Sequence, residues 1–189
     1  MNLKLLALAV IVILVAFGAF ILFSKSSTSP LLGAVHIHSD FKVFIDGQSL
    51  NFSQTKYMST NLTKLSNFVH LHDGDGDIIH AHISGVTLGE FFRSVKMSLN
   101  STCFSTENQT FCNNGQKQLK MYVNGAENNE FASYVLNDLD RVLVTYGTVN
   151  LTQELNSVTD KACIPSGKCP ERGIPENESS CLTGSDCIV

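Results

Sequence analysis

Hydrophobic and polar residues alternate along several short segments of this chain, a pattern typical of β-strands that bury one face. The segment 36–44 shows it clearly, with Phe41 and Val43 on either side of Lys42. The same pattern predicts further strands over 68–72, 78–83, 119–123 and 140–146. The pairs Asp46-Gly47 and Asn124-Gly125 predict tight turns, and a returning strand over 49–52 is expected after the first of them.

One helix is predicted among these strands. Thr87 and Glu90 fit a capping box, in which each residue satisfies a backbone N–H of the other. An apolar stripe follows at helical spacing and ends before Asn100; it consists of Leu88, Phe91, Phe92, Val95 and Met97. A short helix is also expected within 148–162, whereas 53–67 is polar and predicts a loop. Strands, a helix and more strands indicate an α+β fold, a mostly antiparallel sheet with one packed helix.

The first part of the chain has a different pattern. The stretch 5–23 is uncharged and almost entirely apolar, long enough at about 1.5 Å per residue to cross a membrane core of about 30 Å. No small-residue cleavage site follows, so we expect an uncleaved signal anchor over 1–25 rather than a cleaved signal peptide. A serine-rich linker over 26–33 then leads to a domain over 34–160 that lies outside the cytoplasm. The net charge of −4, without a basic cluster, argues against nucleic acid as a partner.

Cysteines and glycosylation sequons agree with an exterior location. All six cysteines follow residue 100, and an even number suits an oxidising compartment. Their spacing favours disulfides between sequence neighbours, Cys103 with Cys112, Cys163 with Cys169 and Cys181 with Cys187. We interpret 161–189 as a disulfide-stapled, Cys-rich tail. Sequons indicate a glycoprotein surface at Asn51, Asn61, Asn100, Asn108, Asn150 and Asn177.

The histidines carry the strongest chemical signal. All six occur as three His-x-His pairs, namely His36 and His38, His70 and His72, and His80 and His82. In a strand, such a pair aims two imidazoles at the same side. The last two pairs flank the turn-like run 73–77, and a hairpin centred on Gly76 would set His72 opposite His80 and His70 opposite His82. Any register that differs by an even number of residues keeps these four rings on one face.

Clustered neutral imidazoles suit a borderline-soft metal ion, so the sequence predicts a zinc or copper site formed by the four hairpin histidines. His36 and His38, on a neighbouring strand, either complete this site or begin a second one. The alternatives are ordinary strand histidines and a pH-sensing cluster. The run 73–77 lacks the Gly and Glu positions of an EF-hand, and we interpret it as an acidic turn whose carboxylates orient histidine rings. Asp138 and Asp140 are expected to be structural carboxylates in a turn and at a strand edge.

Two parts of the sequence resemble known groups of proteins. The segment 79–147 is similar to β-grasp domains of the SLBB and cobalamin-binding kind, through GVTLGEFF at 85–92, VNG at 123–125 and LDRVLVTYG at 139–147. The chain as a whole, with HLHDGDGDIIHAH at 70–82 and CIPSGKCPERG at 163–173, resembles uncharacterised membrane-anchored archaeal proteins. Members of that group are sometimes labelled protein-disulfide isomerases, although this chain has no C-x-x-C motif.

The expected function is a membrane-anchored extracytoplasmic protein that binds zinc or copper through its histidine pairs. Its expected partners are the membrane and the metal ion, and no protein partner follows from the sequence. Two alternatives of other classes stay open. One is an enzyme, either metal-dependent or a thiol–disulfide isomerase, and the other is a cell-envelope interaction protein that binds no metal.

Overall fold

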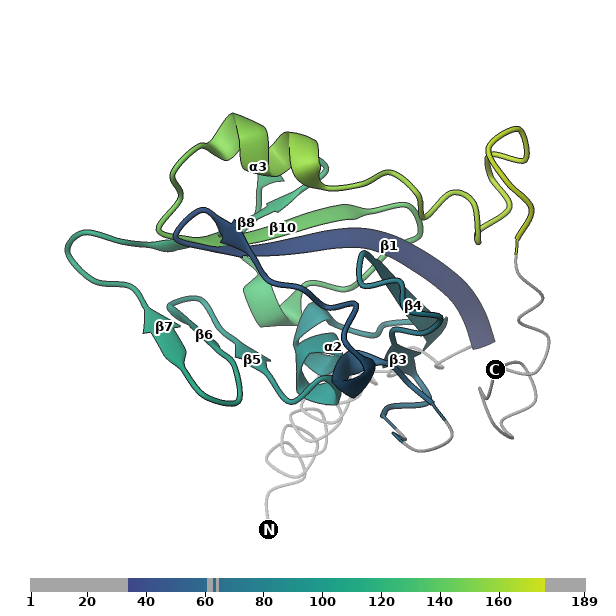
Figure 1. The fold of residues 1–189 in the computed structure, drawn as a ribbon, viewed down its shortest axis with the longest axis horizontal. Coiled ribbons are helices and arrows are strands. Elements are labelled where there is room, and N and C mark those ends of the chain that lie inside the picture. Colours follow the sequence, from purple (N-terminus) through teal and green to yellow (C-terminus); the bar gives the residue numbers. More distant parts are fainter. Residues whose placement is uncertain (1–33, 61–62, 64, 176–189) are drawn as a thin grey trace, which may run out of the picture. The chain divides into compact units, whose positions relative to one another are not determined.

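The computed structural model describes residues 34–60, 63 and 65–175, and these residues form the α+β fold expected from the sequence (Figure 1). The strands are β1 (Ala34–Ile45), β2 (Gln48–Ser49), β3 (Val69–His70), β4 (Ile78–Ile83), β5 (Ser98–Leu99), β6 (Cys103–Ser105), β7 (Thr110–Cys112), β8 (Leu119–Val123), β9 (Ala126–Glu127) and β10 (Arg141–Tyr146). The helices are α2 (Leu88–Ser94) and α3 (Leu151–Ser157), with 3-10 turns η1 (Thr55–Tyr57) and η2 (Phe131–Ser133).

One sheet organises the described part of the chain. Its strands lie in the order β3, β4, β1, β10, β8 and β9, and β2 pairs with the last residues of β1. The central strands β1 and β10 are parallel, with Asp40 beside Arg141 and Ile45 beside Tyr146. The other pairs of this sheet are antiparallel, so the mostly antiparallel sheet is confirmed.

The predicted turns form as their sequences require. Both residues of Asp46-Gly47 have positive φ, 52° and 76°, and so do both residues of Asn124-Gly125, at 52° and 84°. Two consecutive positive φ angles define a type I′ turn, whose twist matches that of the flanking strands. Each turn therefore returns the chain to pair β2 with β1 and β9 with β8.

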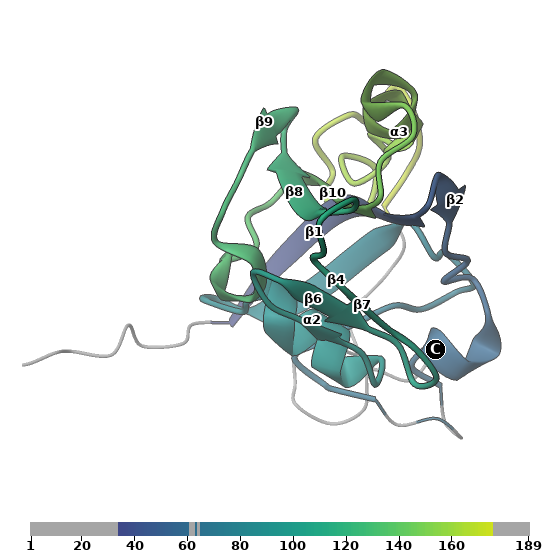
Figure 2. The same cartoon turned by 90° about the vertical axis from the view of Figure 1, so that its left-hand side faces the viewer.

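The two faces of the main sheet have different roles because successive side chains of a strand point in opposite directions. On one face, Phe41 and Val43 of β1 and Ile79 of β4 belong to the main hydrophobic core, with α2 and the small sheet β5–β6–β7. On the other face, Tyr122 and Leu143 form a second, smaller core with residues of α3. Figures 1 and 2 show α2 and α3 on opposite sides of the sheet. The histidines of β1 and β4 alternate with core residues and therefore face the α3 side.

Helix α2 begins with the predicted capping box. The hydroxyl of Thr87 accepts the N–H of Glu90 at 3.2 Å, and the Glu90 carboxylate accepts the N–H of Thr87 at 2.7 Å. The helix ends before Lys96, whose φ of 59° turns the chain. Val95 and Met97 lie beyond the last helical residue but are still buried, so the apolar stripe continues into the following segment.

Two of the predicted disulfides are confirmed. Cys103 and Cys112 are register partners on β6 and β7, and their disulfide closes this hairpin. The Cys163–Cys169 disulfide closes a loop that follows α3. The carboxylate of Asp40 on β1 accepts hydrogen bonds from the hydroxyl of Thr159 and the N–H of Lys161 and Ala162, so the segment after α3 is attached to the sheet.

Several predictions concern residues that the structure does not describe. The anchor over 1–25, the pair Cys181 and Cys187, and the sequons at Asn61 and Asn177 lie outside the described residues. The remaining sequon asparagines are exposed, at Asn51, Asn100, Asn108 and Asn150. Within residues 34–60, 63 and 65–175, no helix has the length and apolar character needed to span a membrane.

Candidate metal centre

The three histidine pairs come together because β4 lies between β3 and β1. His80 on β4 is the register partner of His70 on β3 and of His38 on β1. We call the six residues the histidine cluster; they are His36, His38, His70, His72, His80 and His82. Neighbouring rings in the cluster have centroids 3.8–6.4 Å apart. His36 is half-buried and the other five are buried, so the sheet brings all six predicted site residues into one cluster.

The predicted register of the histidine hairpin is wrong by two residues. His80 pairs with His70 rather than with His72. After His70 the chain leaves β4, because Leu71 forms a bridge with Met58 instead. The carbonyl of His72 then accepts the N–H of Asp75 and closes a turn. An even shift preserves the face, and the contacts among the four rings confirm that both pairs share it.

Hydrogen bonds fix the proton position on two of these rings. Nδ1 of His70 lies 2.9 Å from the carbonyl oxygen of Ser66, which can only accept. Nδ1 of His72 contacts a carboxylate oxygen of Asp73, which also accepts. In the neutral rings, Nδ1 therefore carries the proton and Nε2 carries the lone pair. Asp73 thus orients a histidine ring, which is the role predicted for the acidic turn.

A longer hydrogen-bond chain fixes the ring of His38. The hydroxyl of Ser166 donates to Oδ1 of Asp138 at 2.5 Å, so its oxygen accepts from Nδ1 of His38 at 2.8 Å. Asp138 also accepts the backbone N–H of His38 at 3.0 Å. The sequence predicts only a turn carboxylate at Asp138 and no role for Ser166. No local signal could have joined them, because Ser166 follows His38 by 128 residues.

This arrangement differs from a Ser-His-Asp catalytic triad. In a triad, the histidine accepts the serine proton on one ring nitrogen and donates to the carboxylate from the other. Here Ser166 and Asp138 both lie on the Nδ1 side of His38, and the serine proton goes directly to Asp138.

Asp140, in contrast, accepts from the Tyr134 hydroxyl at 2.6 Å and the Asn137 N–H at 3.0 Å. It is a structural carboxylate, as expected.

Two ring nitrogens of the cluster, on His72 and His80, lie at hydrogen-bonding distance. Nε2 of His72 lies 3.0 Å from Nδ1 of His80. Since Nε2 of His72 carries a lone pair, a hydrogen bond requires His80 to donate. A pocket of about 170 Å³ opens beside the two rings. It is lined by His72, Asp73, Asp75, Ile78, His80, Lys161, Ile164, Pro165 and Ile174.

The ring nitrogens of the cluster do not surround a single metal position in this structure. Among the described residues, no three His, Cys, Asp or Glu side chains form a group that could hold a metal ion as they stand. The cluster therefore provides one close nitrogen pair, His72 and His80, and further rings at contact distance from it, such as His38, whose ring centroid is 4.7 Å from that of His80.

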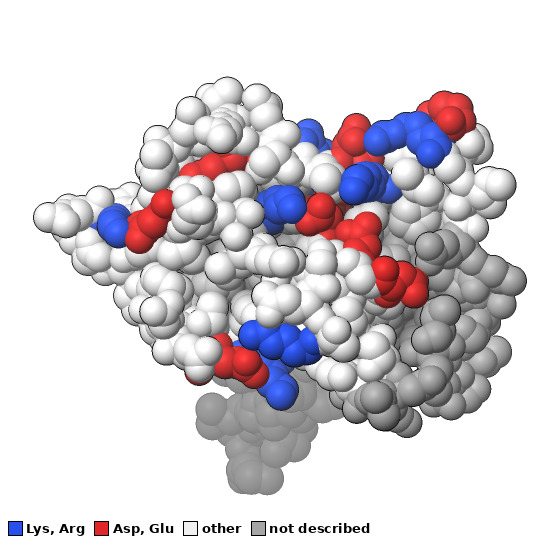
Figure 3. All heavy atoms as spheres, in the orientation of Figure 1, with Lys and Arg blue, Asp and Glu red and all other residues white. Residues whose placement is uncertain are grey.

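The charged residues do not form a second candidate site on the face drawn in Figure 3. Figure 3 shows Lys and Arg interspersed with Asp and Glu on one face, without a continuous basic patch. Several of these residues form ion pairs, among them Lys117 with Asp46 at 2.7 Å and Arg172 with Asp160 at 2.8 Å. Comparison of the chain with protein-family models, with curated proteins and with solved structures found no match.

Proposed function

We propose that this chain binds a transition-metal ion, zinc or copper, through the histidine cluster, on a domain held outside the cytoplasm by the N-terminal anchor. One observation carries the proposal. His38, His70 and His72 each donate Nδ1–H to an acceptor, so the lone pair of each neutral ring lies on Nε2, the nitrogen that would bind the metal. Histidines that ligate metals almost always have such a partner on the second ring nitrogen, and it fixes their tautomer and orientation.

The distance between His72 and His80 supports the same conclusion. Two imidazole nitrogens at about 2.0–2.1 Å from a tetrahedral zinc ion lie about 3.3 Å from each other. The observed separation of 3.0 Å is close to that value. A tetrahedral zinc site or a tetragonal copper site would be completed by rotation of neighbouring rings, of which His38 is the closest to His80 among those with a fixed tautomer. The adjoining pocket would admit the ion or a further small ligand.

The scaffold that we propose for this site is β-grasp-like. The antiparallel pair β1 and β4, the helix α2 and the antiparallel pair β8 and β10 follow one another along the chain. In the sheet they lie in the order β4, β1, β10, β8, with the central pair parallel. This order is the arrangement of β-grasp domains and supports the resemblance to the SLBB kind. A thiol–disulfide isomerase gains no support here, because the two described disulfides join cysteines 9 and 6 residues apart, not in C-x-x-C.

The proposal is tested by thermal unfolding of the full-length chain, purified in a non-ionic detergent and freed of metal. A metal at about 100 times its dissociation constant should stabilise the folded form by about 2.7 kcal/mol, or about 5–10 °C for a chain of this size. Zinc and copper are tested separately, and magnesium, which prefers oxygen ligands, is the control ion. Below about pH 6 the shift should disappear, because protons compete with the metal for imidazole.

The matched variant is His72→Gln/His80→Gln, which keeps polar side chains of similar size. It should lose the metal-dependent shift but melt close to the parent chain without metal. Metal analysis of the dialysed protein should give a stoichiometric content for the parent chain alone. The proposal fails if neither zinc nor copper raises the melting temperature at neutral pH, or if the variant responds as the parent does.

A further inference from the structure

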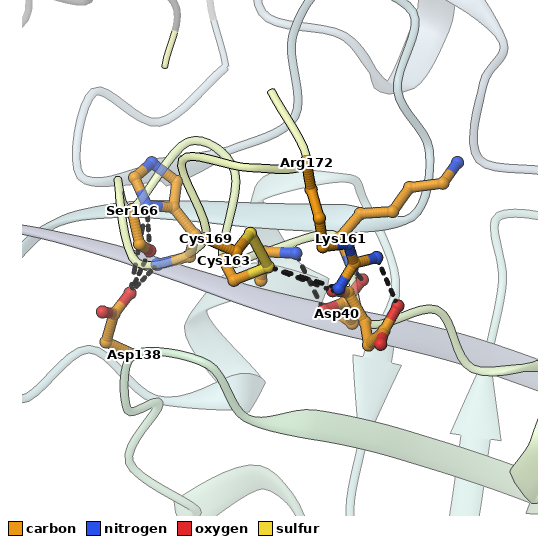
Figure 4. Close-up of a disulfide and its surroundings, with 10 residues drawn as sticks. Asp40, Asp138, Lys161, Cys163, Ser166, Cys169 and Arg172 are labelled. Atoms are coloured by element: carbon orange, nitrogen blue, oxygen red, sulfur yellow. Dashed lines mark hydrogen bonds and ion pairs between the residues drawn. A yellow bond between two sulfur atoms is a disulfide. The ribbon is translucent and has the colours of Figure 1, made fainter. Parts of the chain in front are cut away.

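The Cys163–Cys169 loop lies beside β1 (Figure 4), and Ser166 within it contacts His38 of that strand. Two sets of contacts anchor it at its start. Asp40 of β1 accepts the N–H of Lys161 at 2.8 Å and of Ala162 at 2.9 Å. Arg172, which follows the loop, donates to the side chain of Asp160 at 2.8 Å and to its carbonyl at 3.1 Å. The loop is therefore fixed to the sheet at its base and closed on itself by the disulfide.

Ser166 occupies the middle of this loop and contacts His38 of the cluster. Its hydroxyl has a single proton, which Asp138 receives at 2.5 Å, and its oxygen accepts the proton on Nδ1 of His38 at 2.8 Å. Gly167 follows with φ of +65°, a conformation that favours glycine and that bends the loop back immediately after the serine. The bend at Gly167 and the Cys163–Cys169 disulfide both shape the loop that carries this hydroxyl.

We infer that Ser166 and Asp138 are positioning residues for His38, and that the Cys163–Cys169 loop is the element that delivers Ser166 to the metal centre. This inference rests on the proposed function. Carboxylate partners that act on a ligating histidine typically change metal affinity by about 10–100-fold when they are removed. In this chain the carboxylate acts through a serine, and the serine comes from a loop that a disulfide closes on itself and that hydrogen bonds to Asp40 attach to the sheet.

The first test replaces the hydroxyl. Ser166→Ala should weaken zinc binding to the full-length chain by about 10-fold or more, whereas Ser166→Thr, which keeps the hydroxyl, should restore most of the affinity. Ser157→Ala is the matched control, because the Ser157 hydroxyl makes a comparable bond, to the carbonyl of Glu154 at 2.6 Å, away from the cluster. The Ser157→Ala variant should bind zinc as tightly as the parent chain.

A second readout does not depend on metal. In the metal-free chain labelled with ¹⁵N-histidine, two-bond ¹H–¹⁵N couplings should show His38 protonated on Nδ1 at neutral to mildly basic pH. Ser166→Ala should change this pattern to a mixture of tautomers, and Ser157→Ala should leave it intact. A purely structural role of Ser166 would not move the tautomer signal of a single ring.

The loop itself is tested with Cys163→Ser/Cys169→Ser. This variant should lose zinc affinity and the fixed His38 tautomer as Ser166→Ala does, and adding Ser166→Ala to it should cause little further loss. Cys103→Ser/Cys112→Ser, which opens the disulfide of the β6–β7 hairpin, should preserve the His38 tautomer. The inference is overturned if the parent chain binds zinc and Ser166→Ala leaves both affinity and tautomer unchanged.

The outcomes separate this inference from the proposed function. If the parent chain binds neither zinc nor copper but Ser166→Ala still releases the His38 tautomer, the metal proposal fails and the positioning role stands. If the parent chain binds metal and Ser166→Ala changes neither the affinity nor the His38 tautomer, the metal proposal stands and the positioning role fails.

Discussion

Replacing Asp40 by Asn tests how the segment after α3 is held against the sheet. Asp40 lies on β1 and is 1% exposed. Its Oδ1 accepts the Thr159 hydroxyl and the N–H of Lys161, and its Oδ2 accepts the N–H of Ala162 at 2.9 Å. The carboxylate thus satisfies three donors from a segment that has few other hydrogen bonds to β1.

The expected loss follows from what an amide can and cannot replace. The carbonyl oxygen of Asn can still accept from Thr159 and Lys161, but without the negative charge. Its NH₂ group would face the N–H of Ala162, so two donors would meet in a buried place. One charge-assisted hydrogen bond is worth about 1.5–3 kcal/mol, and a buried donor left without a partner costs about 1–3 kcal/mol. We therefore expect the free energy of unfolding to fall by about 2–5 kcal/mol.

The measurement is urea unfolding of the full-length chain followed by circular dichroism, with hydrogen exchange of the backbone amides. In Asp40→Asn, the midpoint should move to lower urea, and the amides of Lys161 and Ala162 should exchange much faster. Asp160→Asn is the control, because Asp160 is in the same segment but exposed, and its pair with Arg172 lies in solvent. The reasoning is refuted if both variants unfold at the same urea concentration and both amides keep their protection.

Three further predictions concern the fold. Burial, together with the hydrogen bond to Asp140, raises the pKa of Tyr134 to about 12; the unfolded chain loses this proton near pH 10, so stability should decline between about pH 10 and 12, and Tyr134→Phe should reduce that slope in urea melts. Gly76→Ala should destabilise the chain by about 1–3 kcal/mol or more, since its Cβ would lie 2.3 Å from the backbone nitrogen of Ser53; an unchanged melting temperature would contradict this. Thr87→Ala should remove the N-cap of α2 and cost about 1 kcal/mol, which Thr87→Ser should largely restore in the same melts.

The local features could be predicted because their causes lie within a few residues. The capping box at Thr87, the type I′ turns at Asp46 and Asn124, and the disulfide of Cys103 with Cys112 each depend on side chains close together in the chain. The face shared by the histidines also follows from a period of two, which survives a shift of two residues. From such features one could predict most of the strands and which histidines form the cluster.

The features that could not be predicted depend on distant segments. The register of His70 and His80 is decided by Leu71, which bridges to Met58 and draws the chain away from β4. Ser166 reaches His38 only because α3 and Asp40 bring the end of the described chain over the sheet. Neither relation leaves a periodic pattern, since each joins residues whose spacing in the sequence is set by the whole topology.

The parallel pairing of β1 and β10 has a consequence for the order in which the chain can fold during synthesis. Asp40 and Arg141 are neighbours in the sheet but about a hundred residues apart in the chain, and closing so long a loop carries a large entropic cost. Until β10 is synthesised, one edge of β1 lacks this partner and exposes backbone groups that can pair with another chain. The β1–β4 pair can assemble early, but the Ser166–Asp138 contacts with His38 arrive only with residues 138–166. A nascent chain therefore displays histidine pairs long before these contacts hold His38 in place.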